Sequence, residues 1–134
     1  MPRTYQCGIC PNCLLRRSSL LNALPTTAYS EQYLWNDLTK PDFEKSLNNP
    51  IPLIKHDRQV ARSGVLIMQL LAKTESNPRL PIEIHKLNQA LDSPVDEIRK
   101  NVINLFKQHK QEWDFFLDQC TSPNSWVRAV CEAA

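Results

Sequence analysis

Apolar residues recur along this chain at spacings of three and four, the period of an amphipathic helix, rather than at the alternate spacing of a strand. The longest stripe lies in the carboxy-terminal third and consists of Val95, Ile98, Val102, Leu105, Phe106, Trp113, Phe116, Leu117 and Cys120. We find no run of roughly four to eight residues with strand-like alternation between hairpin turns. The pattern therefore predicts an all-α protein, largely a bundle of short helices.

Prolines mark the predicted ends of these helices. The chain has ten prolines and two glycines, and proline favours the first position of a helix or the connection after it. The predicted helices cover about residues 11–24, 29–38, 57–73, 81–90 and 94–120, and a last helix follows Pro123. Within 57–73 the residues expected to face the core are Val60, Gly64, Ile67, Leu70 and Leu71.

Three of the five cysteines lie within seven residues, as Cys7-x2-Cys10-x2-Cys13. This spacing is poor for disulfides and good for a metal ion in a reducing compartment, so we expect a cytoplasmic protein. Gly8 accepts a tight turn, and Cys13 falls in the first turn of a helix, near the positive end of its dipole. The sequence therefore predicts a structural zinc site on Cys7, Cys10 and Cys13. An iron–sulfur cluster is the main alternative, and a redox Cys-x2-Cys pair lacks the surrounding strand–helix pattern.

The fourth ligand of such a site is open. The candidates are a group outside this chain or one of His56, His85, His109, Cys120 and Cys131. His85 and His109 lie in charged helical surroundings, and Cys120 continues an apolar stripe and is expected to be a buried small hydrophobe. His56 follows the proline-rich break and is slightly favoured among the histidines.

Charge is unevenly distributed. The formal net charge of +2 is too small to predict a nucleic-acid binder, but residues 1–24 carry Arg3, Arg16 and Arg17 and no acidic residue. We expect the pair Arg16 and Arg17 to lie on a solvated helix face and to neutralise the thiolates. No apolar stretch approaches the roughly 18 residues of a membrane span, and the amino terminus lacks the apolar core of a signal peptide.

The segment from Cys7 to Arg17 resembles the zinc-binding end of QueC-type 7-cyano-7-deazaguanine synthases. The pattern CGxCxxCxxR carries the resemblance, which is confined to this short stretch. Members of the family form a zinc site from four cysteines, of which the last three are arranged as here. The resemblance implies that Cys7, Cys10 and Cys13 are zinc ligands, and that the zinc is structural because a closed four-thiolate site has no open position.

The chain departs from that family in three ways. Residues 1–6 contain no cysteine, the Ser-Gly-Gly-x-Asp-Ser loop that binds ATP is missing, and more than 100 residues follow the cluster. Long-tailed relatives occur among QueC-like proteins of anti-phage systems, including the Qat type. We therefore expect the carboxy-terminal part of such an ATP-dependent protein, inactive alone, with ATP bound only in the full-length protein.

The predicted organisation is a zinc-binding segment with the first helices at 1–40, a proline-rich linker at 41–56 and a helical extension at 57–134. The expected partner is the missing amino-terminal half. The alternative is a stand-alone zinc-containing helical module that binds a protein partner. Binding of nucleic acid through Arg3, Arg16 and Arg17 is the least favoured hypothesis, and the tryptophans are expected to pack in a core or an interface.

Overall fold

The computed structural model describes residues 6–24, 32–48, 55–92 and 94–134. The α-helices in these ranges are α1 (Pro11–Ala23), α2 (Lys55–Ala72), α3 (Leu80–Leu91), α4 (Val95–Cys120) and α5 (Trp126–Glu132), with short 3₁₀ helices η1 (Phe43–Ser46) and η2 (Thr74–Ser76). The only pairing of extended segments among the described residues is two isolated bridges, Gln6 with Tyr33 and Trp35 with Leu47. The all-α prediction is confirmed, although α4 is long, at 26 residues.

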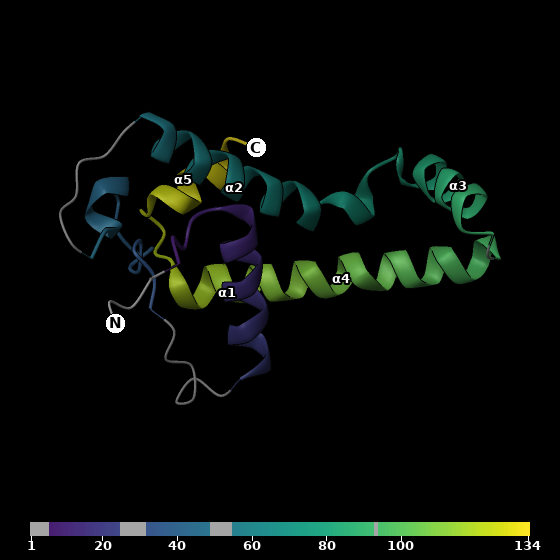
Figure 1. Ribbon diagram of the computed structural model, residues 1–134, viewed down its shortest axis with the longest axis horizontal. Helices are drawn as coiled ribbons and strands as arrows, with labels where there is room; N and C mark the ends of the chain where they lie inside the picture. Colours follow the sequence, from purple (N-terminus) through teal and green to yellow (C-terminus); the bar gives the residue numbers. More distant parts are fainter. Residues whose placement is uncertain (1–5, 25–31, 49–54, 93) are drawn as a thin grey trace.

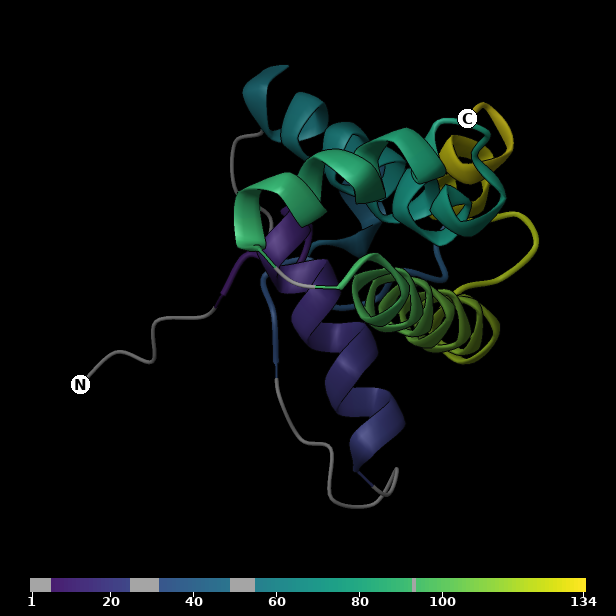
Figure 2. The same cartoon turned by 90° about the vertical axis from the view of Figure 1, so that its right-hand side faces the viewer.

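Helix α4 forms the long axis of the molecule (Figure 1), and the other helices contact one another or α4 along its length. Near the carboxyl end of α4, α1 crosses it and also contacts α2, which in turn packs on α5. At the far end, α3 lies over the first turns of α4. Figure 2 looks nearly along α4 and shows α1 crossing it. None of the helices in the described ranges is both long and apolar enough to cross a bilayer.

One main hydrophobic core joins the cysteine-bearing turn to the carboxy-terminal helices. Ile9 and Leu14 lie in the same buried cluster as Val65 of α2, Phe116 of α4 and Val127 of α5. The cluster also contains all three tryptophans of the chain, Trp35, Trp113 and Trp126, so their predicted packing role is confirmed. The division at 41–56 stays a prediction, and residues on both sides of it share this core.

A second, much smaller cluster lies at the other end of the molecule. Its buried members are Leu80 and Ile84 of α3 and Ile98 of α4. Burial of three aliphatic side chains stabilises this end by only a few kcal/mol, at about 1.5–3 kcal/mol each before conformational entropy is subtracted. The far end is therefore a satellite of the main core.

The helix predicted at 29–38 is wrong in the part that is described, and residues 29–31 lie outside the described residues. From Gln32 to Lys40 the chain has no helix. The amides of Leu34 and Trp35 donate to the carbonyls of Gln6 and Cys7, each at 3.0 Å. Tyr33 and Trp35, two residues apart, are both buried, so this segment has the two-residue period of extended chain. Pairing with the cysteine-bearing segment outweighs the local helical pattern.

The predicted core face of α2 is wrong at Ile67, Leu70 and Leu71 and right at Gly64, whereas Val60 is half-buried. Ile67, Leu70 and Leu71 are 42%, 57% and 37% exposed, and the buried positions are Ala61, Gly64, Val65, Met68 and Ala72. Small residues lie at this face because α2 approaches the cysteine-bearing turn closely. A Cβ atom at Gly64 would stand 2.4 Å from the carbonyl oxygen of Ile9. The close approach excludes a larger residue at Gly64, and Val65 and Met68 fill the apolar part of the same face.

Candidate metal centre

The turn from Cys7 to Cys10 requires glycine at its second position. Gly8 has a φ of +87°, a conformation that other residues adopt only with strain. A Cβ atom there would also stand 2.7 Å from the Cβ of Tyr33 and 3.1 Å from the carbonyl oxygen of Trp35. Both backbone conformation and lack of space therefore require a glycine between the first two cysteines.

Helix α1 begins directly after this turn and carries the third cysteine. Pro11 occupies the first helical turn, and Cys10 is the N-cap, whose Sγ accepts the amide of Cys13 at 3.4 Å. This cap bond links the second and third cysteines of the motif. The same contact therefore caps helix α1 and places Cys13 beside Cys10.

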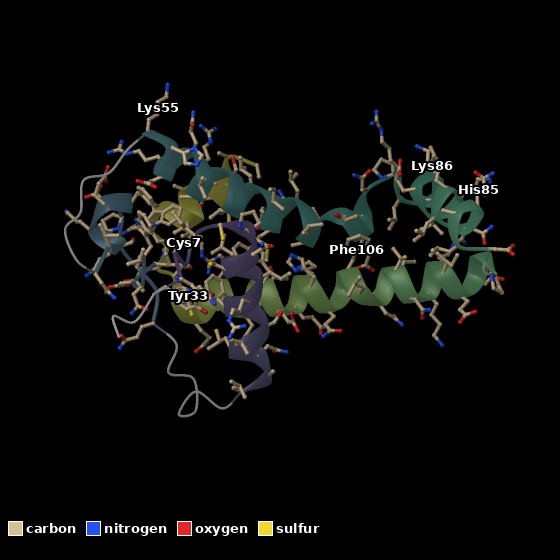
Figure 3. The ribbon with its side chains drawn as sticks, in the orientation of Figure 1. Cys7, Tyr33, Lys55, His85, Lys86 and Phe106 are labelled. Carbon is tan, nitrogen blue, oxygen red and sulfur yellow. The ribbon has the colours of Figure 1, made fainter. Side chains whose placement is uncertain are left out.

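The three thiol groups converge on one point. The Sγ atoms of Cys7, Cys10 and Cys13 all lie within 4.8 Å of one another, and those of Cys7 and Cys13 are 3.5 Å apart. Bonds of about 2.3 Å in a tetrahedron place two sulfurs about 3.8 Å apart. The donor set and its spacing therefore fit a single thiolate-bound metal ion, as the sequence predicted for these three residues. Figure 3 shows Cys7 at the centre of the compact end of the molecule, near Tyr33.

Burial and backbone amides act in opposite directions on these thiols. Burial raises the pKa of Cys7, but the amides of Ile9 and Cys10 donate to its sulfur, and its pKa ends below the usual value. Burial raises the pKa of Cys13 to about 12, against a lowering bond from the Gly8 amide, and the adjacent Cys10 and Cys7 raise it further. The pKa values of the two thiols therefore shift in opposite directions, and Cys13 is the harder of the two to deprotonate for metal binding.

Arg17 holds the cluster turn against the segment beside it. Its guanidinium donates to the carbonyl oxygens of Gly8 (3.2 Å), Trp35 (2.8 Å) and Asn36 (2.8 Å), and lies 4.5 Å from the centre of the Tyr33 ring. Only 5% of the residue is exposed. The expectation of a solvated arginine face is therefore wrong for Arg17.

The other two arginines of the basic segment differ from Arg17. Arg16 is exposed, as expected, and Arg3 lies outside the described residues. Helical phase explains the difference, because Arg17 follows the buried Leu14 by three positions and precedes the buried Leu21 by four. The guanidinium of Arg17 is occupied by backbone carbonyls and is not displayed for phosphate.

The predicted candidates for a fourth ligand lie elsewhere in the structure. His56 and His85 are exposed, on α2 and α3, and Figure 3 shows His85 at the opposite end of the molecule from Cys7. His109 is buried, not in the charged surroundings expected, because its Nε2 lies 3.0 Å from the carbonyl oxygen of Met68. Cys120 is partly buried against the main core, close to the prediction, and Cys131 is buried within it.

Every cysteine and histidine of the chain falls within the described ranges. Among the described residues, only Cys7, Cys10 and Cys13 form a group of metal-ligating side chains. Burial raises the pKa of Cys120, and that of Cys131 to about 11, which suits protonated thiols packed in a core. In this structure the chain therefore supplies three thiols to the centre and no fourth cysteine or histidine.

An apolar groove at the far end is a separate surface feature, which the sequence did not predict. It has a volume of about 390 Å³. Its apolar lining consists of Leu80, Ile84, Leu87, Val102, Leu105 and Phe106. Leu105 is 64% exposed and Leu87 37% exposed, so the apolar stripes of α3 and α4 are only partly covered by each other. Figure 3 shows Phe106 on the side of α4 that faces α2 and α3.

No protein-family model, curated protein or solved structure matches this chain. The resemblance to QueC-type synthases therefore stays confined to residues 7–17 and remains an expectation. The convergence of the three thiols does not depend on that resemblance, because it follows from the positions of the atoms.

Proposed function

We propose that this chain binds a structural zinc ion through Cys7, Cys10 and Cys13, and that the ion fastens the amino-terminal turn to the helical core. The observation that carries the proposal is the convergence of the three Sγ atoms within 4.8 Å. Sulfurs this close suit one ion, whereas an iron–sulfur cluster distributes its thiolates over several iron atoms. Zinc also matches a thiolate donor set better than the oxygen-preferring divalent cations do.

A structural role fits the way the turn is integrated into the fold. Ile9, between the first two ligands, is 2% exposed and belongs to the main core. Cys7 pairs with Trp35 through its carbonyl, and Cys13 lies on α1. An ion on the three sulfurs would therefore fix the positions of the turn, of α1 and of the extended segment relative to one another. Its binding free energy would add to the stability of the fold.

We further propose that the chain is the carboxy-terminal part of a QueC-like ATP-dependent protein, of the long-tailed kind found in anti-phage systems. The support is the CGxCxxCxxR motif together with the helical extension after it. ATP would bind only to the part of the protein that carries the phosphate-binding loop. That amino-terminal half would be the partner, the chain alone would not be catalytic, and a thiol-based zinc site fits a cytoplasmic location.

The metal assignment is tested by elemental analysis of the purified chain. We expect about one equivalent of zinc per chain, lost in a Cys13→Ser variant and retained in a Cys120→Ser variant, which is the matched control outside the centre. Bound iron together with acid-labile sulfide would replace the zinc assignment with an iron–sulfur cluster. A chain that binds no metal at all under reducing conditions would refute the structural role.

The QueC-like assignment is tested by reading the DNA sequence immediately upstream of the codon for Met1. We expect a reading frame that encodes the Ser-Gly-Gly-x-Asp-Ser loop and a further cysteine, and co-expression of its product should yield a stable complex with this chain. An unrelated upstream gene, combined with full zinc loading of this chain alone, would refute the QueC-like assignment.

The second candidate function is a stand-alone zinc-containing module that binds a protein partner. The apolar groove between α3 and α4 favours it, because such a lining accepts the apolar face of an amphipathic helix. An unrelated upstream gene, which would refute the QueC-like assignment, would support the stand-alone module. Nucleic acid remains the least favoured partner, since Arg17 is buried against backbone carbonyls.

A further inference from the structure

A glutamine side chain lies beside the thiol cluster. The thiol of Cys13 donates a long S–H···O bond to Gln6 Oε1, at 3.9 Å. In a tetrahedral site with sulfur at about 2.3 Å and oxygen at about 2.1 Å, a sulfur and an oxygen ligand stand about 3.6 Å apart. The distance from the carboxamide oxygen to the Cys13 sulfur is therefore within a few tenths of an ångström of the value expected when both bind one ion.

The backbone of Gln6 is held in place by the segment that follows the first helix. The carbonyl of Gln6 accepts the amide of Leu34 at 3.0 Å, and the next carbonyl, that of Cys7, accepts Trp35 at 3.0 Å. These bonds involve only main-chain atoms, so the pairing does not use the side chain of Gln6. The same pairing aligns Gln6 with Tyr33, the aromatic ring over which the Arg17 guanidinium lies.

Charge favours a neutral fourth donor. Three thiolates and a divalent ion leave one net negative charge, and a fourth thiolate would leave two. The buried guanidinium of Arg17 donates to the Gly8 carbonyl inside the same turn, so one positive charge stands beside the cluster. With a neutral amide oxygen as the fourth donor, the single negative charge of the centre is balanced by the single positive charge of Arg17. This balance lowers the free-energy cost of burying the centre.

We propose that the Gln6 carboxamide oxygen is the fourth donor when this chain binds the ion alone, so that the centre has three thiolates and one exchangeable oxygen, which a cysteine of the missing half would replace. This inference rests on the proposed function, because it needs a metal ion on the three cysteines. An amide oxygen is a weaker ligand for zinc than a thiolate or an imidazole. The fourth corner is therefore a binding position for an incoming soft donor, of the chemical class of small thiols and imidazoles.

The test uses the cobalt(II)-substituted chain, because cobalt has ligand-field bands that report the donor set and zinc has none. We expect 2-mercaptoethanol, and separately imidazole, to shift these bands in the wild-type chain. Gln6→Cys should show the stronger sulfur-to-cobalt charge-transfer absorption of a four-thiolate site, and 2-mercaptoethanol should then cause no further shift.

Zinc affinity gives an independent readout, measured by competition with a chromophoric chelator. Loss of an interaction that supports a metal ligand set typically costs 10–100-fold in affinity, so Gln6→Ala should weaken zinc binding by about tenfold or more. Gln6→Glu, which keeps an oxygen at the same reach, should retain tight binding. Gln111→Ala is the matched control, an exposed glutamine on α4, and should leave the affinity unchanged.

Two outcomes separate this inference from the proposed function. If Gln6→Ala has the cobalt spectrum and the zinc affinity of the wild type, the glutamine is not a ligand and the inference is overturned, while the three-cysteine centre stands. If the wild-type chain takes up neither zinc nor cobalt, the proposed function fails as well. A cobalt spectrum of the wild type that does not respond to added thiol or imidazole would refute the exchangeable corner.

Discussion

Replacement of Gly64 by alanine should destabilise the protein, against the normal effect of that change in a helix. Gly64 lies in the interior of α2, where alanine is ordinarily better than glycine by about 1 kcal/mol. Here the new Cβ would meet the Ile9 carbonyl oxygen at 2.4 Å, the Leu14 Cδ1 at 3.2 Å and the Pro11 nitrogen at 3.3 Å. Two of these three atoms belong to the backbone of the cysteine-bearing turn, so rotation of a side chain cannot relieve the contact.

The magnitude follows from the displacement that the clash requires. Ordinary contact between the Cβ and the oxygen needs roughly 1 Å more separation, so α2 and the turn must move apart along their whole packed interface. Overpacking of a well-filled core costs typically 1–3 kcal/mol, occasionally more. A 2.4 Å contact with backbone belongs to the upper part of this range, about 2–3 kcal/mol. After the gain of about 1 kcal/mol in helix propensity is subtracted, we expect a net loss of about 1–2 kcal/mol in the free energy of unfolding.

Urea unfolding followed by circular dichroism measures this loss, with zinc present at a fixed concentration. The matched control is Ser63→Ala at the neighbouring exposed position of α2, which should stabilise the protein by up to about 0.5 kcal/mol through propensity alone. A Gly64→Ala variant as stable as the wild type, or more stable, would refute the close approach of α2 to the turn.

Three further predictions test other parts of the structure. Because Cys13, with its pKa raised to about 12, must lose a proton to bind metal, the apparent zinc dissociation constant should fall at least about tenfold per pH unit between roughly pH 6 and 8; an affinity independent of pH would contradict this. Arg17→Lys should cost about 3 kcal/mol or more of unfolding free energy, because one ammonium cannot satisfy three buried carbonyls, whereas the exposed Arg62→Lys should change it by less than about 0.5 kcal/mol. Ile98→Ala should cost about 2 kcal/mol or more in the same urea assay and leave zinc affinity unchanged, since Ile98 belongs to the distant small cluster; a weakened affinity would show that the two ends are coupled.

Local signals were sufficient for most helices and for the cluster of three thiols. Proline lies at or just before the start of α1, α3 and α4, and the apolar spacing that follows each start reports the helix itself. The ligand trio is equally local, because three cysteines and a glycine within seven residues define the turn. Sequence reasoning works here because the determinants lie within one or two helical turns.

The segment around Tyr33 needed information that no local window contains. Its backbone bonds go to Gln6 and Cys7, and its carbonyls at Trp35 and Asn36 are bound by Arg17. Another non-local contact, the approach of the Ile9 carbonyl to Gly64, requires a glycine on the buried face of α2. The burial of Arg17, by contrast, could have been found from helical phase alone.

The two hydrophobic clusters lie at opposite ends of the molecule and differ in size. At one end, the candidate metal turn contributes Ile9 to a core that also holds Trp113 and Val127, so a metal ion there stabilises residues from nearly the whole length of the chain. At the other end, Leu80, Ile84 and Ile98 form a cluster of their own beneath an apolar groove. Leu87 and Leu105 of the groove lining are exposed, so a change at these two positions should cost little global stability, unlike a change at the buried Ile98. The exposed part of the groove lies far from the thiol cluster, so the proposed metal centre and the proposed partner-binding surface can be tested by separate substitutions.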